Sequence, residues 1–367
     1  MAGETTTTQT TQTPAAGSVN ITPDALAKSA AKFRTELLKM PIMALGPALR
    51  YFTLRTGIRY SETVGELSGN IEMGPYDPYR VDTDDVNIVG RTLYTFFGSV
   101  VKKFHPNKIY QSIYGSSITK GEGLKNVPIV LQVLSFLAAK LGKNLALHLF
   151  DAVRNDAGTK TVDLFNGFDT ITAAEITKGN IATSKGNLFE FSEKITSTNA
   201  VDMLVAFCRA ANDELLGDED GSDAMASNIN LMVPRDIVYA YRDDYKATTG
   251  NSPIYDKFNQ TVIEGFPNIK LVPFAGKRNS DYIHLSTKAN CLLGCDLTGD
   301  LEKIIVEKHH PFLLDFVATM FFGAEFESIS PERLLVGKLK KTSTPVTPPA
   351  SGGQAGQGGQ ESESGNN

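Results

Sequence analysis

The chain has 367 residues, enough for one large domain or two modest ones, and its 41% hydrophobic content is ordinary for a globular protein. Its net charge of −5 argues against a dedicated nucleic-acid binder, whose phosphate contacts need clustered Lys and Arg. Three cysteines are too few for a disulfide framework, the first residues lack the basic start and apolar core of a secretory signal, and no apolar run is long enough to span a bilayer.

Both ends of the sequence are predicted to be disordered. Residues 1–20 are mostly Thr, Gln, Ala and Gly, and residues 341–367 are mostly Thr, Pro, Gly, Gln and Ser. Neither segment has enough large apolar side chains for burial to offset the entropy lost on ordering. We therefore predict a disordered arm at the beginning and a flexible tail at the end.

The segment that follows the disordered arm is predicted to be helical in two places. Apolar residues at helical spacing after Thr22 and Pro23 predict one helix, which stops near Pro41. A second, short helical piece is predicted over Leu45 to Leu54.

A long hairpin is predicted over Ile58 to Phe104. Alternating and β-branched residues flank a polar centre rich in Pro and Asp, Gly74 to Asp85, which is typical of two strands joined by an extended tip. A lone hairpin is marginally stable in water, so one that projects from its domain usually lies on a partner surface.

The longest sustained helical pattern in the chain runs from Asn126 to Arg154. It predicts an amphipathic helix, because apolar residues follow one stripe with Gln132, Lys143 and Arg154 roughly opposite. Further apolar side chains on the polar side predict that another element or subunit covers that side. The stripe consists of Val130, Leu134, Leu137, Leu141, Leu145, His148 and Ala152, and the second apolar set consists of Ile129, Phe136, Leu147 and Phe150.

The remainder of the chain mixes helices with late strands, which predicts an α+β fold. A turn is predicted over Asp163 to Thr172, a helix from an Asn199 N-cap to Gly217, and a helix from Pro234 to Gly250 after a short strand. Strands are then predicted at Asn268 to Gly276, Asp281 to Thr287, Asn290 to Leu297, Glu302 to Glu307 and Phe312 to Phe322.

The cysteines are predicted to be structural. Cys291 and Cys295 have a spacing that suits a metal or a redox pair, but no matching Cys or His pair completes a zinc site. Cys208 lies on an apolar helical stripe, where a thiol behaves as a small buried hydrophobe.

The histidines do not indicate a reactive site either. His309 and His310 are adjacent on a predicted strand, so their side chains point to opposite faces and cannot easily chelate one ion. His148 lies on the stripe of the long helix and is predicted to be a hydrogen-bonded core residue, in preference to a catalytic base.

The acidic loop Gly217 to Asp223 resembles a calcium loop only superficially. With Gly221 at the turn position of an EF-hand, Leu216 and Ser227 would occupy ligand positions that need oxygen donors and a final carboxylate. A solvated loop at the end of a helix fits better. The sequence also contains no phosphate-binding glycine loop after a strand, no Gly-x-Ser-x-Gly motif and no paired-acid motif, so we predict no enzyme activity, metal or cofactor.

Three phrases carry a family resemblance: PNIKLVPFAG (Pro267 to Gly276), SDYIHLSTKANCLLGCDL (Ser280 to Leu297) and the final strand ending in FFGAEFE (Phe321 to Glu327). They resemble the C-terminal half of major capsid proteins of tailed bacteriophages, which have the Hong Kong 97 fold. The segment RTLYTFFGSVVKKFHPNKIYQSIYG (Arg91 to Gly115) resembles the corresponding part of capsid proteins from phages or prophages of Bacteroides-type bacteria. The resemblance covers roughly Ile58 to Gly337.

The resemblance implies a domain organisation for the whole chain. A spine helix over 126–154 would tie the extended loop to the domain that surrounds it. The implied parts are a disordered arm (1–20), an N-terminal arm (21–57), an extended hairpin loop (58–104), a peripheral domain with the spine helix (105–186), an axial domain (187–298), return strands of the peripheral domain (299–340) and a disordered tail (341–367).

The resemblance also implies a structural function. Many copies of the chain would form pentamers and hexamers and assemble into an icosahedral shell around double-stranded DNA, in the virion capsid and, during assembly, in the cytoplasm of a bacterial host. A scaffolding protein and a portal are expected partners, DNA is expected to make weak non-specific contacts, and no membrane is involved. The expected contact with a neighbouring subunit is the hairpin tip, at Tyr76, Asp77, Tyr79 and Arg80.

Two other functions are compatible with the sequence. Encapsulins share the fold, so a cargo compartment is one alternative to a virus shell. A soluble α+β enzyme or binding protein that uses the acidic loop or the Cys291 and Cys295 pair is the other.

Overall fold

The computed structural model describes residues 45–68, 75–76, 87–104, 129–217, 229–249, 261–296, 303–310 and 313–340. The predictions of disorder for 1–20 and 341–367, and of a helix that stops near Pro41, lie outside the described residues.

Two sheets and a separate hairpin organise the described part of the chain, which confirms the predicted α+β class. The hairpin pairs β2 with β3 over Ser61–Ser68 and Asn87–Tyr94. The six-stranded sheet has the order β5-β13-β9-β6-β8-β7 and consists of Leu188–Glu190, Leu334–Lys338, Tyr282–Thr287, Ile229–Pro234, Phe266–Phe274 and Val262–Ile263. The five-stranded sheet has the order β1-β10-β12-β11, with β4 also paired to β12, and consists of Thr53–Thr56, Cys291–Cys295, Leu313–Phe326, Lys303–His310 and Phe96–Phe104.

Helices cover the two faces of the six-stranded sheet. On one face, α8 (Ala200–Arg209) and α10 (Arg235–Thr249) enclose a core with β6, to which Ile229, Leu231 and Val233 contribute. On the other face, α7 (Phe168–Thr177), the end of α6 (Ile129–Leu147) and strands of the five-stranded sheet enclose a second core, here called the central core. Because both faces of β6 are covered, its residues are buried throughout. The remaining short helices are α3 (Gly46–Leu49), α9 (Asp213–Leu216), η2 (Thr161–Asp163), η3 (Thr183–Lys185) and η6 (Ala275–Lys277).

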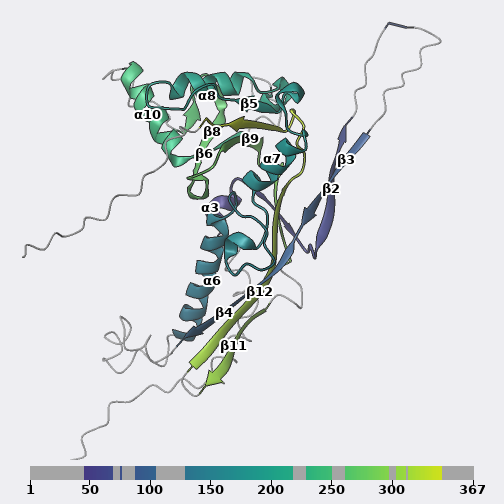
Figure 1. The fold of residues 1–367 in the computed structure, drawn as a ribbon, viewed down its shortest axis with the longest axis vertical. Coiled ribbons are helices and arrows are strands. Elements are labelled where there is room, and N and C mark those ends of the chain that lie inside the picture. The colour runs from purple at the N-terminus through teal and green to yellow at the C-terminus, as the bar shows by residue number, and fades with distance from the viewer. Residues whose placement is uncertain are drawn as a thin grey trace, which may run out of the picture.

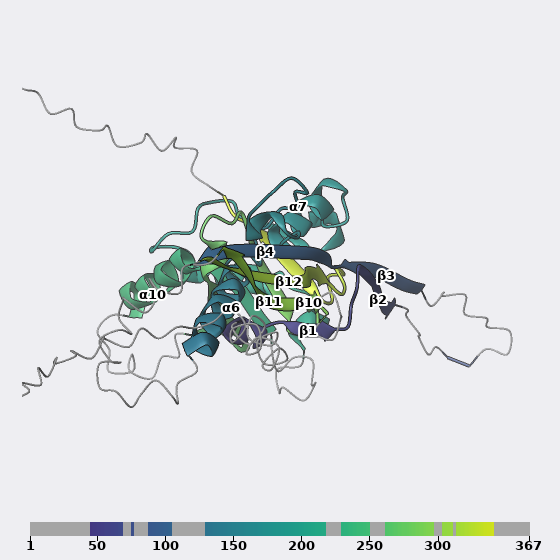
Figure 2. The ribbon, with the colours of Figure 1, turned by 90° about the horizontal axis from the view of Figure 1, so that it is seen from below.

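The molecule is elongated. The six-stranded sheet with α8 and α10 forms one end, strands β4, β11 and β12 form the other, and α6 runs between them (Figure 1). The hairpin leaves the body on the side away from α6, as both views show (Figures 1 and 2). Strand β12 holds the lower end together because it pairs with β10, β11 and β4.

The long helix ends earlier than predicted. Helix α6 stops at Leu147, and the chain turns where the prediction continued to Arg154. The carbonyl groups of Leu149 and Phe150 accept hydrogen bonds from Phe168 and Asp169, at distances of 3.0 and 3.1 Å, so the start of α7 replaces the next helical turn. The periodicity of the side chains continues through the turn, which is why the pattern overestimated the length.

Helix α7 occupies the place of a predicted turn. The prediction for Asp163 to Thr172 was wrong from Phe168 onward, where α7 begins after Gly167. Thr170, Ile171 and Thr172 are β-branched and have modest helix propensity, so the sequence signal is weak. Burial of one face of the helix in the central core compensates for that propensity.

The short helix predicted over Leu45 to Leu54 is present only as α3, because the chain then enters β1. The helix predicted from Asn199 to Gly217 is divided into α8 and α9. Asn199 does not cap α8 with its side chain; Asp244 of α10 accepts the hydrogen bond of the Val201 amide at 2.8 Å. The strands predicted after residue 267 and the helix predicted after Pro234 are present.

The predicted hairpin is shorter than its predicted span. Residues 61–68 pair with 87–94, but Phe96–Phe104 is β4 and belongs to the five-stranded sheet. Two strand pairs also join residues that were expected in different domains. Strand β10, in the expected axial domain, pairs with β12, and strand β13, among the expected return strands of the peripheral domain, pairs with β9 of the expected axial domain. The boundaries of the peripheral and axial domains stay a prediction.

Candidate functional site

The base of the hairpin is the place where the projecting strands meet the body. Val64 of β2 and Arg91 of β3 are paired in register and share one face of the hairpin. Val64 and Leu93 are buried with Ile58 and Leu292 in a small apolar cluster, here called the base cluster. This face therefore turns Arg91 toward the body.

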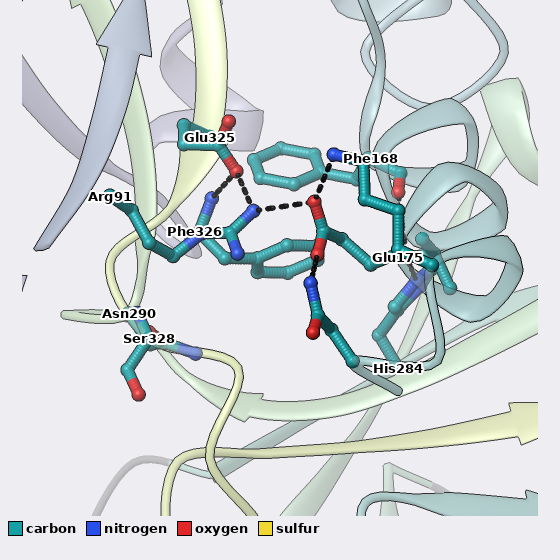
Figure 3. Close-up of polar contacts among 11 residues, drawn as sticks. Arg91, Phe168, Glu175, His284, Asn290, Glu325, Phe326 and Ser328 are labelled. Carbon is teal, nitrogen blue, oxygen red and sulfur yellow. Dashed lines mark hydrogen bonds and ion pairs between the residues drawn. The ribbon is translucent and has the colours of Figure 1, made fainter. Parts of the chain in front are cut away.

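Arg91 joins the hairpin to two elements of the body (Figure 3). Its Nη2 lies 2.8 Å from Oε1 of Glu325 on β12 and 3.7 Å from Oε1 of Glu175 on α7. The side chains of these three residues, here called the hairpin network, are 13%, 14% and 8% exposed, so solvent screens them little.

Both carboxylates of the hairpin network have further partners. Glu175 accepts hydrogen bonds from Lys178 Nζ at 3.0 Å and Asn180 Nδ2 at 2.7 Å, and Glu325 accepts one from the Phe326 amide at 3.0 Å. Burial raises the pKa of Glu175, but the hydrogen bonds from Asn180 and Lys178 and the charge of Arg91 outweigh it, so the pKa is lowered. Burial raises the pKa of Glu325 and is only partly opposed by Arg91.

A second polar group, here called the buried cluster, lies inside the central core. Lys277 is fully buried and its Nζ donates to Asp169 Oδ1 at 2.7 Å and to the Tyr282 carbonyl at 2.9 Å. The ammonium also lies 4.4 Å from the centre of the Phe150 ring. Burial lowers the pKa of Lys277, against the opposing effect of Asp169.

His284 completes the buried cluster and is held as a neutral imidazole. Thr172 donates its hydroxyl hydrogen to the Phe168 carbonyl at 2.8 Å, so the 2.9 Å contact with His284 Nε2 requires the ring to donate. The other ring nitrogen, Nδ1, lies 3.7 Å from Asp169 Oδ1 and makes no hydrogen bond. Burial, with the nearby charge of Lys277, lowers the pKa of His284 well below its usual value.

The predicted contact residues of the hairpin tip are only partly described. Tyr76 is 93% exposed, as a contact residue of an isolated chain would be. Asp77, Tyr79 and Arg80 lie outside the described residues, so the predicted inter-subunit contact stays a prediction.

The cysteines and His148, which the sequence analysis considered as candidates for chemistry, lie in the core or away from both polar groups. Cys208, Cys291 and Cys295 are buried and form no disulfide, and burial raises the pKa of the Cys208 and Cys291 thiols to about 12. His148 is half-buried, with Nδ1 3.0 Å from Asp151 Oδ1. The acidic loop beyond Gly217 lies outside the described residues, as do the side chains of His309 and His310.

Neither polar group was predicted from the sequence. Their members come from segments that are far apart in the chain, and each is a common residue without a motif around it. The only local signal is a charged residue inside an otherwise uncharged strand, as at Arg91 in NIVGRTLY. Within the described residues, no three His, Cys, Asp or Glu side chains are placed to hold a metal ion, and no helix has the length and hydropathy of a membrane span.

Several large apolar side chains of the described residues remain exposed. Phe136 and Leu147 of α6 are 68% and 44% exposed, on the side that the sequence predicts to be covered. Tyr60, beside the hairpin, is 65% exposed and has φ +71°, a backbone conformation that is unusual for a bulky residue. Such side chains are typical of surfaces that contact another chain.

Solved structures with a similar fold come from phage-type capsids. One is a chain of the satellite phage P4 procapsid that includes the size determination (Sid) protein, with a TM-score of 0.50, 10% identity, and coverage of 84% of this chain and 98% of that chain. Another is a chain from the capsid of the native GTA particle, with a TM-score of 0.51, 11% identity, and coverage of 92% and 96%. No family model and no curated protein sequence matches the chain. The likeness to these structures confirms the predicted α+β capsid-protein fold.

Proposed function

We propose that the chain is the major capsid protein of a tailed double-stranded DNA phage or prophage, and that many copies assemble into an icosahedral shell. The observation that carries this proposal is the fold, which covers nearly the whole length of chains from the P4 procapsid and the GTA capsid. The projecting hairpin supports it, because an exposed two-stranded element gains stability from a partner surface.

The proposed role is structural and not enzymatic. The charged groups of the two polar clusters are engaged in internal ion pairs: Lys277 is paired with Asp169, and Arg91 with Glu325. The three cysteines are buried. These arrangements stabilise a fold and offer no accessible nucleophile.

In the proposed shell, the chain forms pentamers and hexamers through repeated weak contacts that add up by multivalency. A scaffolding protein and a portal are the proposed assembly partners, in the cytoplasm of a bacterial host. The net charge of −5 implies that packaged DNA is tolerated with weak non-specific contact and is not gripped.

Assembly of the purified chain tests the proposal. Sedimentation and electron microscopy should detect closed shells, formed by the chain alone or together with a scaffolding protein. A chain that stays monomeric in every assembly condition, with and without scaffold, contradicts the proposal. Shells isolated from the native host should contain DNA; shells that contain an enzyme and no DNA would instead indicate an encapsulin-like compartment.

The hairpin tip provides a more specific test. Changing Tyr76, Tyr79 and Arg80 together to Ala should leave the folding of the monomer unchanged and impair assembly, because the tip is proposed to contact a neighbouring subunit. Circular dichroism and sedimentation measure the two effects separately. Normal shells from this variant would refute the contact.

A further inference from the structure

Two glycines lie directly beneath the point where the hairpin leaves the body. Gly294 of β10 and Gly323 of β12 are paired in register, so together they form a bare patch on one face of the sheet, here called the glycine notch. The chain between β3 and β4 passes over this patch. A Cβ added to Gly323 would lie 1.9 Å from the Tyr94 carbonyl oxygen, and one added to Gly294 would lie 2.7 Å from Thr95 Cγ2. Glycine at both positions therefore allows the crossing chain to lie this close to the sheet.

The glycine notch marks a change in the course of the chain. Strand β4 pairs with β12 as far as Phe96 and Phe322. At the next position of β12, Gly323, the chain leaves that pairing and crosses the face of the sheet, because Leu93 is buried with Leu292 of the neighbouring strand β10. Figure 2 shows how β4 continues into β3, which leaves the body. The notch is therefore the place where a strand of the sheet becomes a strand of the hairpin.

The crossing chain is held in place on both sides of the glycine notch. The Thr95 amide donates to the Tyr60 carbonyl at 2.8 Å, and Thr95 Oγ1 donates to the Ile58 carbonyl at 3.2 Å, so the entry and the exit of the hairpin are bonded to each other. Further along β3, Arg91 is paired with Glu325 of β12. The hairpin thus rests on the body at two points, the glycine notch and the hairpin network.

Because the two support points are close together, a small displacement at the notch changes the direction of the hairpin. A Cβ atom essentially never lies closer than 3.0 Å to another heavy atom, so a methyl group on Gly323 would have to move the Tyr94 carbonyl oxygen from 1.9 Å to at least that distance. Tyr94 and Arg91 are separated by roughly 10 Å along the strand. With the hairpin network intact, the displacement therefore tilts the hairpin by about 6°.

We infer that the glycine notch sets the angle at which the hairpin leaves the body, and that this angle sets the curvature of the shell. The inference rests on the proposed function, in which the projecting hairpin lies on a partner surface. In a closed assembly every contact is repeated, so a small change of angle between neighbouring copies changes the size of the shell or prevents closure. Gly294 and Gly323 are positioning residues, because they act through the chain that crosses above them.

Substitution of Gly323 tests the inference with the larger displacement. In Gly323→Ala the added methyl group meets backbone atoms, and rotation of a side chain cannot relieve that contact. We expect this variant to assemble, but with the wild-type diameter lost as the main class and replaced by shells of another diameter or by open or tubular particles. The matched control is Gly98→Ala in β4 of the same sheet, since the three atoms nearest to its methyl group all belong to the Leu164 side chain. Its shells should keep the wild-type diameter.

A compensating pair of substitutions tests the contact at the notch itself. Gly294→Ala should change the particles less than Gly323→Ala does, because its methyl group meets the side chain of Thr95 and not the backbone. Thr95→Ser removes Cγ2 and keeps the hydroxyl group that bonds to the Ile58 carbonyl. Gly294→Ala combined with Thr95→Ser should therefore recover the wild-type diameter, and Thr95→Ser alone should leave it unchanged.

Electron microscopy and sedimentation measure the diameter and shape of the particles, and circular dichroism checks that each variant is folded. A loss of stability alone lowers the yield of particles and leaves their diameter unchanged, so the diameter separates a positioning role from a merely structural one. A folded Gly323→Ala variant that forms wild-type shells, or no particles at all, overturns the inference, as does a combined variant without recovery. If Gly323→Ala does not fold, the Gly294 and Thr95 variants decide by the same criteria. Wild-type protein that never forms shells contradicts the proposed function itself.

Discussion

The central core and the base of the hairpin differ in how much apolar surface holds each of them. Among the described residues, the central core contains 23 buried apolar side chains, whereas the base cluster contains four. In the central core, Phe168 stacks on Phe52 with 5.2 Å between ring centroids and lies 4.9 Å from Phe326. The hairpin instead depends on the hairpin network, in which one Arg joins it to two body elements.

Because of this difference, substitutions that remove contacts should have different effects in the two regions. A loss in the central core affects every element that packs on it, so the whole body should lose stability. A loss at the base should change the hairpin alone, because few body residues depend on it. We therefore expect the hairpin to open under conditions in which the body stays folded.

The largest expected effect is in the central core. Phe168→Ala removes a fully buried ring and should lower the free energy of unfolding by about 3–5 kcal/mol. Urea unfolding of the unassembled chain measures it. The comparison variant is Leu93→Ala in the base cluster, which should speed amide exchange in β2 and β3 and shift the body's unfolding transition much less. Equal losses in the two variants would mean that hairpin and body unfold as one unit.

The next largest effect is expected from Arg91, and it distinguishes the contribution of the hairpin network to stability from that of the base cluster. Arg91→Met keeps an apolar stem but leaves Glu325 without a cation, and removing one partner of a buried pair costs about 3–5 kcal/mol. We expect a loss at the lower end of that range, since Glu175 keeps Lys178 and Asn180 as partners. Hydrogen exchange should show the loss in β2 and β3, and unchanged exchange there would contradict the anchoring role.

Arg91→Lys is the control for the hairpin network. Lysine preserves the charge but replaces the planar guanidinium, whose Nη2 lies near both carboxylates, with a compact and more strongly hydrated ammonium. Exchange in the hairpin should therefore lie between that of the wild type and that of Arg91→Met.

The buried cluster makes the stability of the body depend on pH. The pKa of His284 is lowered in the folded state, so the unfolded chain binds the proton more readily. The stabilising contribution is thus complete above the unfolded pKa of about 6.5 and is lost as the pH falls below it, by up to about 1.4 kcal/mol per pH unit.

Melting temperatures between pH 7 and pH 5 measure this loss, and His284→Gln removes the titrating group. The difference between wild type and variant isolates the histidine from carboxylates such as Glu175, whose lowered pKa places its own effect at more acidic pH. A pH dependence that is identical in both proteins would show that His284 does not titrate on unfolding.

The comparison also explains which parts of the structure the sequence predicts. Strands such as β6 and β9, the helix α10 and the hairpin pairing follow from local periodicity and turn residues, which act over a few positions. The end of α6 does not, because the backbone amides of Phe168 and Asp169 bond to the carbonyl groups of Leu149 and Phe150, each 19 positions earlier in the chain. Gly276 also packs on that end: an added Cβ would lie 2.1 Å from the Leu147 carbonyl oxygen.

The polar sites were less predictable than the fold. Arg91 and Glu325 are 234 positions apart, and Asp169 and Lys277 are 108 apart. The first pairing depends on how β3 and β12 converge and the second on how α7 and η6 converge, which no local pattern encodes.

The smallest expected effect comes from substituting two glycines that have similar backbone conformations and similarly open surroundings. Gly57, before the hairpin, and Gly179, after α7, have φ of +84° and +74°, and an added Cβ would meet no atom within 4 Å at either position. Alanine therefore costs only backbone strain, about 1 kcal/mol in each case. Gly179→Ala should lower the unfolding free energy of the body, whereas Gly57→Ala should mainly raise amide exchange in β2 and β3. If Gly57→Ala lowers the body's stability as much as Gly179→Ala does, the entry to the hairpin is part of the body's cooperative unit and not a separate joint.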